Sequence, residues 1–308
     1  MISKSWGNSL DAQSTTSSAP ILTFDVGGSH ISAGICNLNS LQVISLASGS
    51  LHEGFTSDDF VNLLYDLGCK VAGNPPNVAG AALAVPGPFD FAAGVSYMRH
   101  KLRSLYGLDL RRALADRFGL DPGQICFLND ACAFLLGEVG AGAARGARRA
   151  VGIGLGTGIG SAFARDGHWV TDGEGVPPGG EIWDLPYGTV TVEDLLSTRA
   201  LKKDYAMRTG RDEEVVAIAN AAATDAGARQ VFETFGLHLG QVFRDILAPF
   251  APDIVVIGGG ISRSADLFLP SAQKQLAGTG FHLVTSTLLD KAPLVGAASF
   301  WREACVVQ

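Results

Sequence analysis

Two glycine-rich turns are the first features of this sequence that could carry chemistry. Residues 25–29 read Asp-Val-Gly-Gly-Ser and residues 154–160 read Gly-Leu-Gly-Thr-Gly-Ile-Gly, and each joins two apolar stretches that we predict to be strands. Glycine lets backbone N–H groups approach a phosphate closely, and Ser29 and Thr157 add hydroxyl donors. Either turn alone could be a plain hairpin, but two of them at matching places in the two halves of the chain favour phosphate binding.

Carboxylates occur where a cleft could use them. Asn129-Asp130 lies where a predicted strand meets a predicted helix, so Asp130 is either the helix N-cap or a general base for an attacking hydroxyl. Position alone leaves these two roles equal. Glu181 lies in an irregular Pro/Gly-rich segment, and Glu193 and Asp194 fall in the first turn of a predicted helix, where the helix dipole favours acids. Taken singly, each of these three is more often a solvated carboxylate.

Several other functional classes are disfavoured by composition and motifs. There is no Gly-Lys dipeptide, which excludes a P-loop, and no Gly-x-Gly-x-x-Gly, His-Glu-x-x-His or Gly-x-Ser-x-Gly motif. The 30 acidic residues outnumber the 23 Lys and Arg, for a net charge of −7, which disfavours nucleic acid or anionic membrane as a partner. The five cysteines are scattered, and no secretory signal or membrane-spanning run is visible, so we expect a cytoplasmic protein.

The apolar pattern places these residues on two similar α/β units. Residues 1–19 lack apolar periodicity and are predicted to be a flexible tail. Strands are expected at 21–24, 30–36, 42–46, 79–85 and 124–128, with helices from about Ser57, as a cap, to 71 and at 108–118. The second half repeats this order, with strands at 150–155, 161–164, 253–257 and 281–286 and helices from 192, around 232–246 and at 293–301.

This repetition predicts an internal duplication with a cleft between two lobes. The first lobe would span residues 20–130 and the second 131–290, and a helix at about 291–305 would pack back on the first lobe. Ligand sites of α/β sheets lie beyond strand ends, at glycine-rich turns. We therefore expect the turns and the carboxylates to converge on the cleft.

Taken together, these segments resemble the ROK family of repressors, open reading frames and kinases. The resemblance covers about residues 20–303, and its pieces are weak singly but specific in this order. They are residues 25–29, Pro86-Gly87-Pro88, Asn129-Asp130-Ala131, residues 155–160, Gly180-Glu181 and residues 257–262. The resemblance implies an α/β, two-lobed, actin-like sugar kinase fold, duplicated from a ribonuclease H-like unit, with its active site between the lobes.

The resemblance assigns roles on the sugar side of the cleft. Asp130 looks like the catalytic base that deprotonates a sugar hydroxyl. Asn129, Glu181 and Glu193 look like residues that bind sugar hydroxyls. Asp184 stands where the family has the His of a Gly-His pair, and it is expected, with Gly87, to lie beside the substrate.

The resemblance also assigns the donor side. Asp25 is similar to the acid that holds hydrated magnesium. The residues expected to flank the donor phosphates are Gly27, Gly28, Ser29, Gly156, Thr157 and Gly158. The residues expected to lie against the adenine or its ribose are Gly258, Gly259 and Gly260.

The sequence departs from the family pattern in three places. The Cys-rich zinc motif is absent and the Gly-His pair reads Trp183-Asp184, so we expect no zinc and a sugar pocket rich in hydrogen-bond acceptors. The segment 97–102 lacks the Asn-Leu pair typical of the family's glucokinases. Residues 258–263 resemble the polyphosphate-glucokinase branch, which leaves inorganic polyphosphate as an alternative donor.

These expectations define a kinase that transfers a phosphoryl group from ATP, with magnesium, to a hydroxyl of a hexose-like sugar. We expect a homodimer whose other partners are small molecules. A transcriptional repressor of this family would need a helix-turn-helix domain, and only about 20 residues precede the first predicted strand. A catalytically inactive sugar-sensing protein is the remaining alternative.

Overall fold

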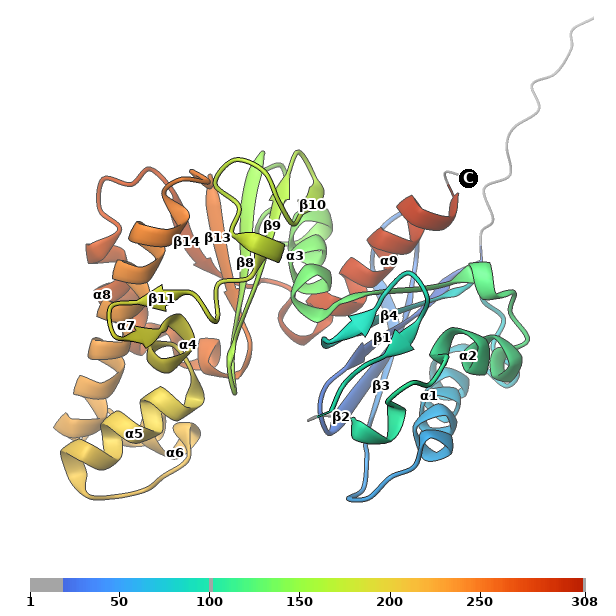
Figure 1. The fold of residues 1–308 in the computed structure, drawn as a ribbon, viewed down its shortest axis with the longest axis horizontal. Coiled ribbons are helices and arrows are strands. Elements are labelled where there is room, and N and C mark those ends of the chain that lie inside the picture. Colours follow the sequence, from blue (N-terminus) through green and yellow to red (C-terminus); the bar gives the residue numbers. More distant parts are fainter. Residues whose placement is uncertain (1–18, 100–101, 307–308) are drawn as a thin grey trace, which may run out of the picture.

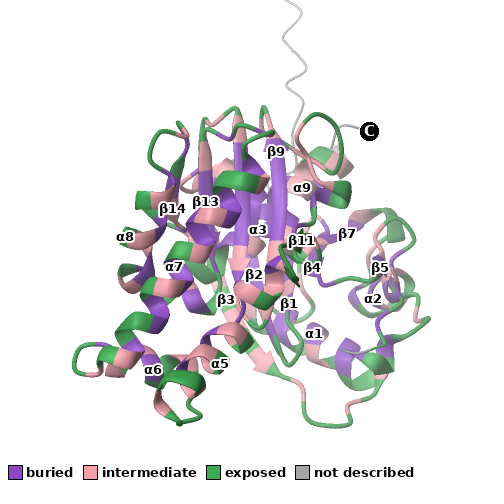
Figure 2. Cartoon of the chain, turned by 60° about the vertical axis from the view of Figure 1, so that its left-hand side comes forward, coloured by how far each residue is buried: buried purple, intermediate pink, exposed green. Residues whose placement is uncertain are grey.

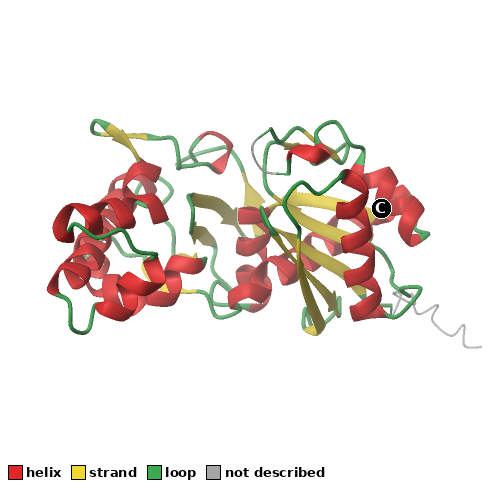
Figure 3. Ribbon diagram, turned by 90° about the horizontal axis from the view of Figure 1, so that it is seen from below, coloured by secondary structure: helices red, strands yellow, loops and turns green. Residues whose placement is uncertain are grey.

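The computed structural model describes residues 19–99 and 102–306, so the tail predicted for residues 1–19 lies almost wholly outside the described residues. Two α/β lobes lie side by side, each built on a five-stranded sheet (Figure 1). Helices cover both faces of the strands (Figure 3). The fold is thus the duplicated α/β architecture expected from the sequence.

The first sheet has the strand order β3-β2-β1-β4-β7. Its strands are β1 (Ile21–Val26), β2 (His30–Cys36), β3 (Val43–Ser50), β4 (Ala81–Val85) and β7 (Ile125–Asn129). The first three pair antiparallel, and β1, β4 and β7 run parallel. All five residues of β4 are buried, as its continuous apolar sequence Ala-Ala-Leu-Ala-Val requires, whereas β3 at the edge alternates between partly buried and exposed residues.

The second sheet repeats this pattern with the order β10-β9-β8-β13-β14. Its strands are β8 (Arg149–Leu155), β9 (Ile159–Arg165), β10 (His168–Val170), β13 (Ile254–Gly258) and β14 (His282–Thr285). The first three again pair antiparallel, and β8, β13 and β14 run parallel. In both sheets the order is third, second, first, fourth and fifth strand, which is the signature of the internal duplication.

Each sheet is buried between helices. On one face of the first sheet lie α1 (Ser57–Ala72) and α2 (Leu110–Phe118), and on one face of the second lie α7 (Ala226–Leu247) and α8 (Ala265–Gln275). The smaller helices beside α7 are α4 (Val192–Leu195), α5 (Thr198–Thr209) and α6 (Val215–Ala221). The buried residues gather on the strands and on the helix faces turned toward them (Figure 2). Two-residue strands complete the fold: β5 (Phe89–Asp90), β6 (Val95–Ser96), β11 (Pro186–Tyr187) and β12 (Val190–Thr191).

The other face of each sheet is covered by a helix that follows the last strand of the opposite sheet. The helix α3 (Asp130–Ala141) follows the last strand of the first sheet but packs on β8 and β9 of the second. Conversely, α9 (Ala292–Val306) follows the last strand of the second sheet but packs on β1 and β4 of the first. The two helices lie against each other between the lobes (Figure 1).

Glycine makes the close crossing of α3 and α9 feasible. A Cβ atom on Gly296 would lie 1.8 Å from the carbonyl oxygen of Ala133, and one on Gly137 would lie 2.0 Å from that of Ala292. Both separations are far inside van der Waals contact, so the two backbones touch here. The crossing joins the lobes behind the cleft.

Several elements differ from the prediction. Thr56, not Ser57, caps α1, because Thr56 and Asp59 form a reciprocal capping box and Ser57 is the first helical residue. The strand expected at 42–46 continues to Ser50, and the short helices α5 and α6 and the helix α8 were not predicted individually. Within the described residues, no helix is both long and apolar enough to cross a membrane.

Candidate active site

A cavity of about 740 Å³ opens between the two sheets. Its lining comes from both lobes and from segments far apart in the sequence. From the first half these are Asp25, Pro86, Gly87, Pro88, Asn129, Asp130, Ala131 and Phe134. From the second half they are residues 154–161, Glu181, Trp183, Glu193, Gly259 and Pro293. The cavity therefore gathers residues that the sequence separates by up to 268 positions, 293 minus 25.

Strand topology explains this convergence. The parallel strands β1, β4 and β7 end near Asp25, Val85 and Asn129, so their following residues share one edge of the first sheet. In the second sheet β8 and β13 are parallel in the same way and end at Leu155 and Gly258. The cleft lies where these two edges face each other.

Asn129, and not Asp130, is the N-cap of α3. The Asn129 side-chain oxygen accepts hydrogen bonds from the backbone N–H groups of Ala131, at 2.9 Å, and Cys132, at 3.3 Å, so Asn129 is the N-cap of α3. Asp130 is the first residue of the helix and is exposed in the cleft. The capping function expected as one alternative for Asp130 therefore belongs to its neighbour.

Asp25 has an unusual environment at the end of β1. Its pKa is raised from 3.8 to about 7, chiefly by burial and further by the negative charges of Asp130 and Asp290. Burial also raises the pKa of the Cys132 thiol to about 12, with contributions from the charges of Asp130 and Glu181. Asp130 thus lies within electrostatic reach of both Asp25 and Cys132.

Glu181 is held by the segment around it. The hydroxyl of Ser161 on β9 donates to the carbonyl of Gly180, at 2.7 Å, and accepts from the N–H of Ile182, at 3.1 Å. The indole N–H of Trp183 donates to Oε2 of Glu181 at 2.9 Å. Trp183 thus orients Glu181, which is expected to bind the sugar, and the sequence did not suggest this role for Trp183.

Of the two acids Asp184 and Glu193, only Glu193 lines the cavity. Asp184 is exposed and is not among the residues that line the cavity. Glu193, in the first turn of α4, lines the cavity and accepts a hydrogen bond at 3.3 Å from the backbone N–H of Ile159. The structure therefore puts Glu193 against the second glycine-rich turn.

The two glycine-rich turns also differ. Gly156, Thr157 and Gly158 line the cavity, and the turn is closed by a bond from the N–H of Gly156 to the carbonyl of Gly158, at 2.9 Å. The other turn, Gly27-Gly28-Ser29, is exposed next to Asp25 but does not line the cavity. Of the three glycines expected to lie against the adenine or its ribose, Gly259 lines the cavity, whereas its sequence neighbours Gly258 and Gly260 do not.

The reason for glycine differs from position to position. Gly259 has φ of 84°, and a Cβ there would lie 2.3 Å from the carbonyl oxygen of Leu155, so packing demands glycine. At Gly156 a Cβ would meet nothing within 4 Å, and φ is not in the left-handed region. Neither packing nor a left-handed backbone conformation requires glycine at 156.

Charge in the cavity is of one sign. Four carboxylates line it, those of Asp25, Asp130, Glu181 and Glu193, and no Lys, Arg or His side chain is among the described residues that do so. None of these charged side chains would attract a phosphorylated ligand. Carboxylate oxygens suit Mg²⁺, which is commonly held by one or two carboxylates together with water and substrate phosphates. Within the described part of the chain, no group of three or more His, Cys, Asp or Glu residues is arranged as a metal cage.

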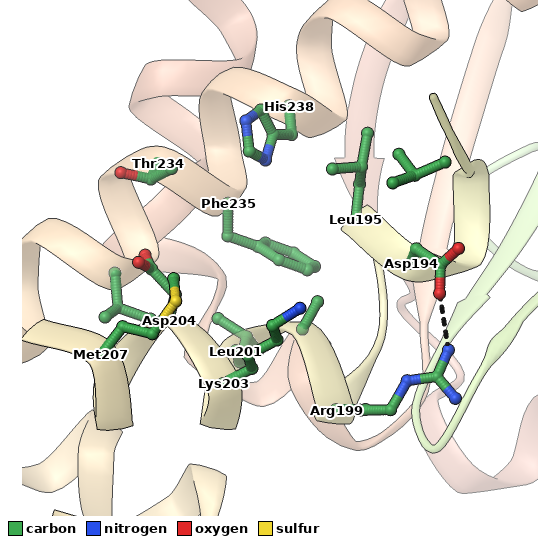
Figure 4. Close-up of a pocket in the computed structure, with 13 residues that line it drawn as sticks. Asp194, Leu195, Arg199, Leu201, Lys203, Asp204, Met207, Thr234, Phe235 and His238 are labelled. Carbon is green, nitrogen blue, oxygen red and sulfur yellow. Dashed lines mark hydrogen bonds and ion pairs between the residues drawn. The ribbon is translucent and has the colours of Figure 1, made fainter. Parts of the chain in front are cut away.

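Residues of α5 line two further pockets. One, of about 460 Å³, lies between α5 and α7 and is lined by side chains such as Lys203, Met207 and His238 (Figure 4). The other, of about 600 Å³, is next to Thr157 and has Arg199, Lys202 and Lys203 in its lining. Much of this positive charge is paired, since Arg199 bonds Asp194 and Lys202 bonds Asp212 and Glu214. None of these basic residues was predicted, because a short run of charge in a sequence is usually a solvated helix face.

Duplicated α/β lobes with a cleft between them define the actin-like class of sugar kinase folds. Within that class, the chain belongs to the ROK family, whose sequence profile matches residues 21–304. This confirms the resemblance inferred from the glycine-rich turns and the Asn-Asp pair.

Similar proteins include enzymes and regulators. The glucokinase of Thermotoga maritima is 27% identical, with 92% of this chain and 97% of that protein covered, and the xylose repressor of Bacillus subtilis is 22% identical, with 89% and 75% covered. A ROK glucokinase from Streptomyces griseus, solved with glucose and AMPPNP, superposes with a TM-score of 0.73 at 22% identity, covering 92% of this chain and 99% of that one. An inorganic polyphosphate/ATP-glucomannokinase from Arthrobacter has a TM-score of 0.68 at 25% identity, covering 94% and 100%.

Proposed function

We propose that this protein transfers the γ-phosphoryl group of ATP to a hydroxyl of a hexose-like sugar. One observation carries the proposal: an exposed acid at the start of α3 and an unobstructed glycine turn from the other lobe line the same cavity. The glucokinase name of the Thermotoga maritima relative and the glucose and AMPPNP bound in the Streptomyces griseus structure support it.

Asp130 is the proposed general base. Its carboxylate would accept the proton of the sugar hydroxyl as that oxygen attacks the phosphorus, in line with the departing ADP. The neighbouring Asn129 uses its oxygen to cap α3, so its side-chain NH₂ is the group that would donate to the sugar. Glu181, held by Trp183, would accept from a sugar hydroxyl on the other wall.

The donor would lie along the second lobe. The backbone of Gly156, Thr157 and Gly158 would hold the phosphates, and Gly258–Gly260 would lie against adenine or ribose. Gly27, Gly28 and Ser29 would approach the phosphates from the first lobe. Asp25 would hold hydrated Mg²⁺, which supplies positive charge to the transferring phosphoryl group when bound.

Lobe closure is a further part of the proposal. The lobes 20–130 and 131–290, the first completed by the helix at 291–305, would close on the substrates. Closure excludes water, which would otherwise compete with the sugar as phosphoryl acceptor. The crossing of α3 and α9, where the backbones touch, is the connection about which such a movement would occur.

ATP is preferred to polyphosphate in this proposal. A long polyanion needs an extended groove of unpaired positive charge. The basic side chains nearest the donor turn are few, and Arg199 and Lys202 are already bonded to acids. The ratio of kcat/KM for the two donors tests this, and a clear preference for polyphosphate would overturn it.

The decisive experiment is a coupled assay of ADP release across a panel of hexoses, N-acetylhexosamines and polyols. Turnover with one of them, lowered about 10²–10⁴-fold in Asp130→Asn, supports the kinase. Sugar binding without turnover for every member of the panel would instead identify a sugar-sensing protein.

Asp184 remains in the proposed sugar site on its correspondence to the family's His. The variant Asp184→His tests this placement: if the profile of kcat/KM among sugars is unchanged, Asp184 lies outside the site.

A further inference from the structure

Glu193 lies in direct contact with the turn that we assign to the donor phosphates. Its Oε2 accepts the hydrogen bond from the Ile159 N–H, and a Cβ on Gly158 would lie only 2.1 Å from the same oxygen. Only glycine at 158 lets the carboxylate come so close to the backbone. A residue expected to bind sugar is therefore seated on the donor side of the cleft.

This position sets Glu193 against an incoming phosphate. The carboxylate accepts a hydrogen bond from the backbone N–H of Ile159, at the end of the turn. A glycine-rich turn binds a phosphate through such N–H groups, so this donor is already used. Carboxylate and phosphate carry the same sign of charge, and no basic side chain is among the described residues that line the cavity. In the neighbouring pocket beside Thr157, Arg199 and Lys202 are already paired with acids. With Glu193 in place, the turn is a poor site for a donor.

The same residue is also tied to the sugar side. The backbone N–H of Glu193 donates to the carbonyl of Trp183 at 3.0 Å, and the Trp183 indole holds Glu181. Glu193 thus connects the segment that carries Glu181 with the glycine turn. A ligand that attracts its side chain away from Ile159 would change the donor site directly.

We propose that Glu193 makes donor binding depend on sugar. Without sugar its carboxylate occupies the Ile159 N–H and repels the donor phosphates; a sugar hydroxyl that donates to this carboxylate draws it off the turn, and the donor then binds. The inference rests on the kinase function proposed above. Glu193 acts here as a positioning residue, and it limits transfer to water because the donor is held only when a sugar acceptor is present. Linkage requires that the donor raise sugar affinity by the same factor.

The test measures the affinity of Mg²⁺-AMPPNP by calorimetry in the absence of any sugar. Glu193→Gln keeps the size of the side chain but removes its charge, so we expect AMPPNP to bind about tenfold or more tightly than to the unaltered protein. Glu193→Ala also clears the N–H and should show the same gain. Glu181→Gln is the matched control, since it removes one charge from the same cleft without touching the turn, and we expect its effect to be at most a third as large. Thermal unfolding of all three variants checks that each is folded.

A second arm adds glucose, N-acetylglucosamine or whichever sugar supports turnover. AMPPNP affinity should rise with sugar in the unaltered protein and stay constant in Glu193→Ala. Equal or weaker sugar-free affinity in Glu193→Gln, or an equal gain in Glu181→Gln, would overturn the coupling while ADP release still established the kinase. If neither the unaltered protein nor any variant bound AMPPNP, with or without sugar, the proposed function and this inference would fall together.

Discussion

The charge of Asp130, at the start of α3, helps to raise the pKa of Asp25, at the end of β1, to about 7. The larger cause is burial of Asp25 at the base of the cleft, and Asp290 adds a smaller effect. Two acids that repel each other are thus kept together by the meeting of β1 and β7 with β4 between them. A cation between the lobes would relieve this repulsion.

The first prediction concerns the loss of folding stability that ionised Asp25 causes in the metal-free protein. Asp25 ionises near pH 3.8 in the unfolded chain and near pH 7 in the folded protein. The contribution of Asp25 to folding stability is therefore highest below about pH 4, where this residue is protonated in both states, and it falls as pH rises from about 4 to 7. One pKa unit corresponds to about 1.4 kcal/mol, which sets an upper limit of about 4 kcal/mol. Asp25→Asn should therefore be more stable than the unaltered protein above pH 7, with the difference shrinking toward pH 4.

Urea unfolding in EDTA at pH 4.5 to 8 measures this difference. Asp66→Asn, on an exposed face of α1, is a control for the general loss of one negative charge. A stability difference between Asp25→Asn and the unaltered protein that does not change with pH would contradict the raised pKa.

A second prediction separates Asp130 from Asn129. Asp130→Asn should lower kcat by about 10²–10⁴-fold, the usual effect of losing a general base. It should not lower the free energy of unfolding, because the cap of α3 is Asn129 and loss of the Asp130 charge relieves its repulsion of Asp25. Asn129→Ala should instead cost about 1 kcal/mol of stability through loss of the cap. Steady-state kinetics and urea unfolding of both variants check the pair, and near-normal turnover in Asp130→Asn would remove it as the base.

A third prediction compares two glycines that a sequence cannot distinguish. Gly156→Ala meets no atom within 4 Å, so the protein should fold normally, yet the added methyl group lies in the donor turn and should weaken Mg²⁺-AMPPNP binding. Gly296→Ala would place its methyl 1.8 Å from the Ala133 carbonyl oxygen, so it should destabilise the protein by about 3 kcal/mol, the upper range of overpacking. Thermal unfolding and calorimetry measure both quantities. An unstable Gly156→Ala would mean that glycine there serves the fold rather than a ligand.

The positions of the strands along the chain, their repetition and the convergence on a cleft could be predicted because they depend on local patterns repeated along the chain. Buried strands such as Ala81–Val85 are continuously apolar, and each is followed by a turn that stands out by its glycines or prolines. The return of the last helix to the first lobe was also expected, whereas the close crossing of α3 and α9 at Gly137 and Gly296 was not.

The candidate site was predictable only in part, for a physical reason. The cleft is lined by residues at or just after the end of a strand or a rigid turn, namely Asp25, Asn129, Asp130, Glu181 and the 156–158 turn. The contact between Glu193 and Ile159 joins residues 34 positions apart, and the Trp183 bond to Glu181 depends on one side-chain rotamer. Such details arise from packing of an irregular loop, on which strand and helix periodicity gives no information.

The last prediction concerns Trp183, which lines the cleft. Its indole N–H bonds Oε2 of Glu181 at 2.9 Å, and both side chains are largely exposed, so the bond orients Glu181 more than it stabilises the fold. Trp183→Phe keeps an aromatic ring but has no N–H to donate. Loss of about 1 kcal/mol of orientation corresponds to a roughly fivefold rise in KM for the sugar, with a smaller change in kcat and in KM for ATP. Trp169→Phe, a tryptophan of β10 outside the cleft, is the matched control and should leave all three constants near normal. A rise in KM for ATP alone, in Trp183→Phe, would place the tryptophan on the donor side and contradict its role beside Glu181.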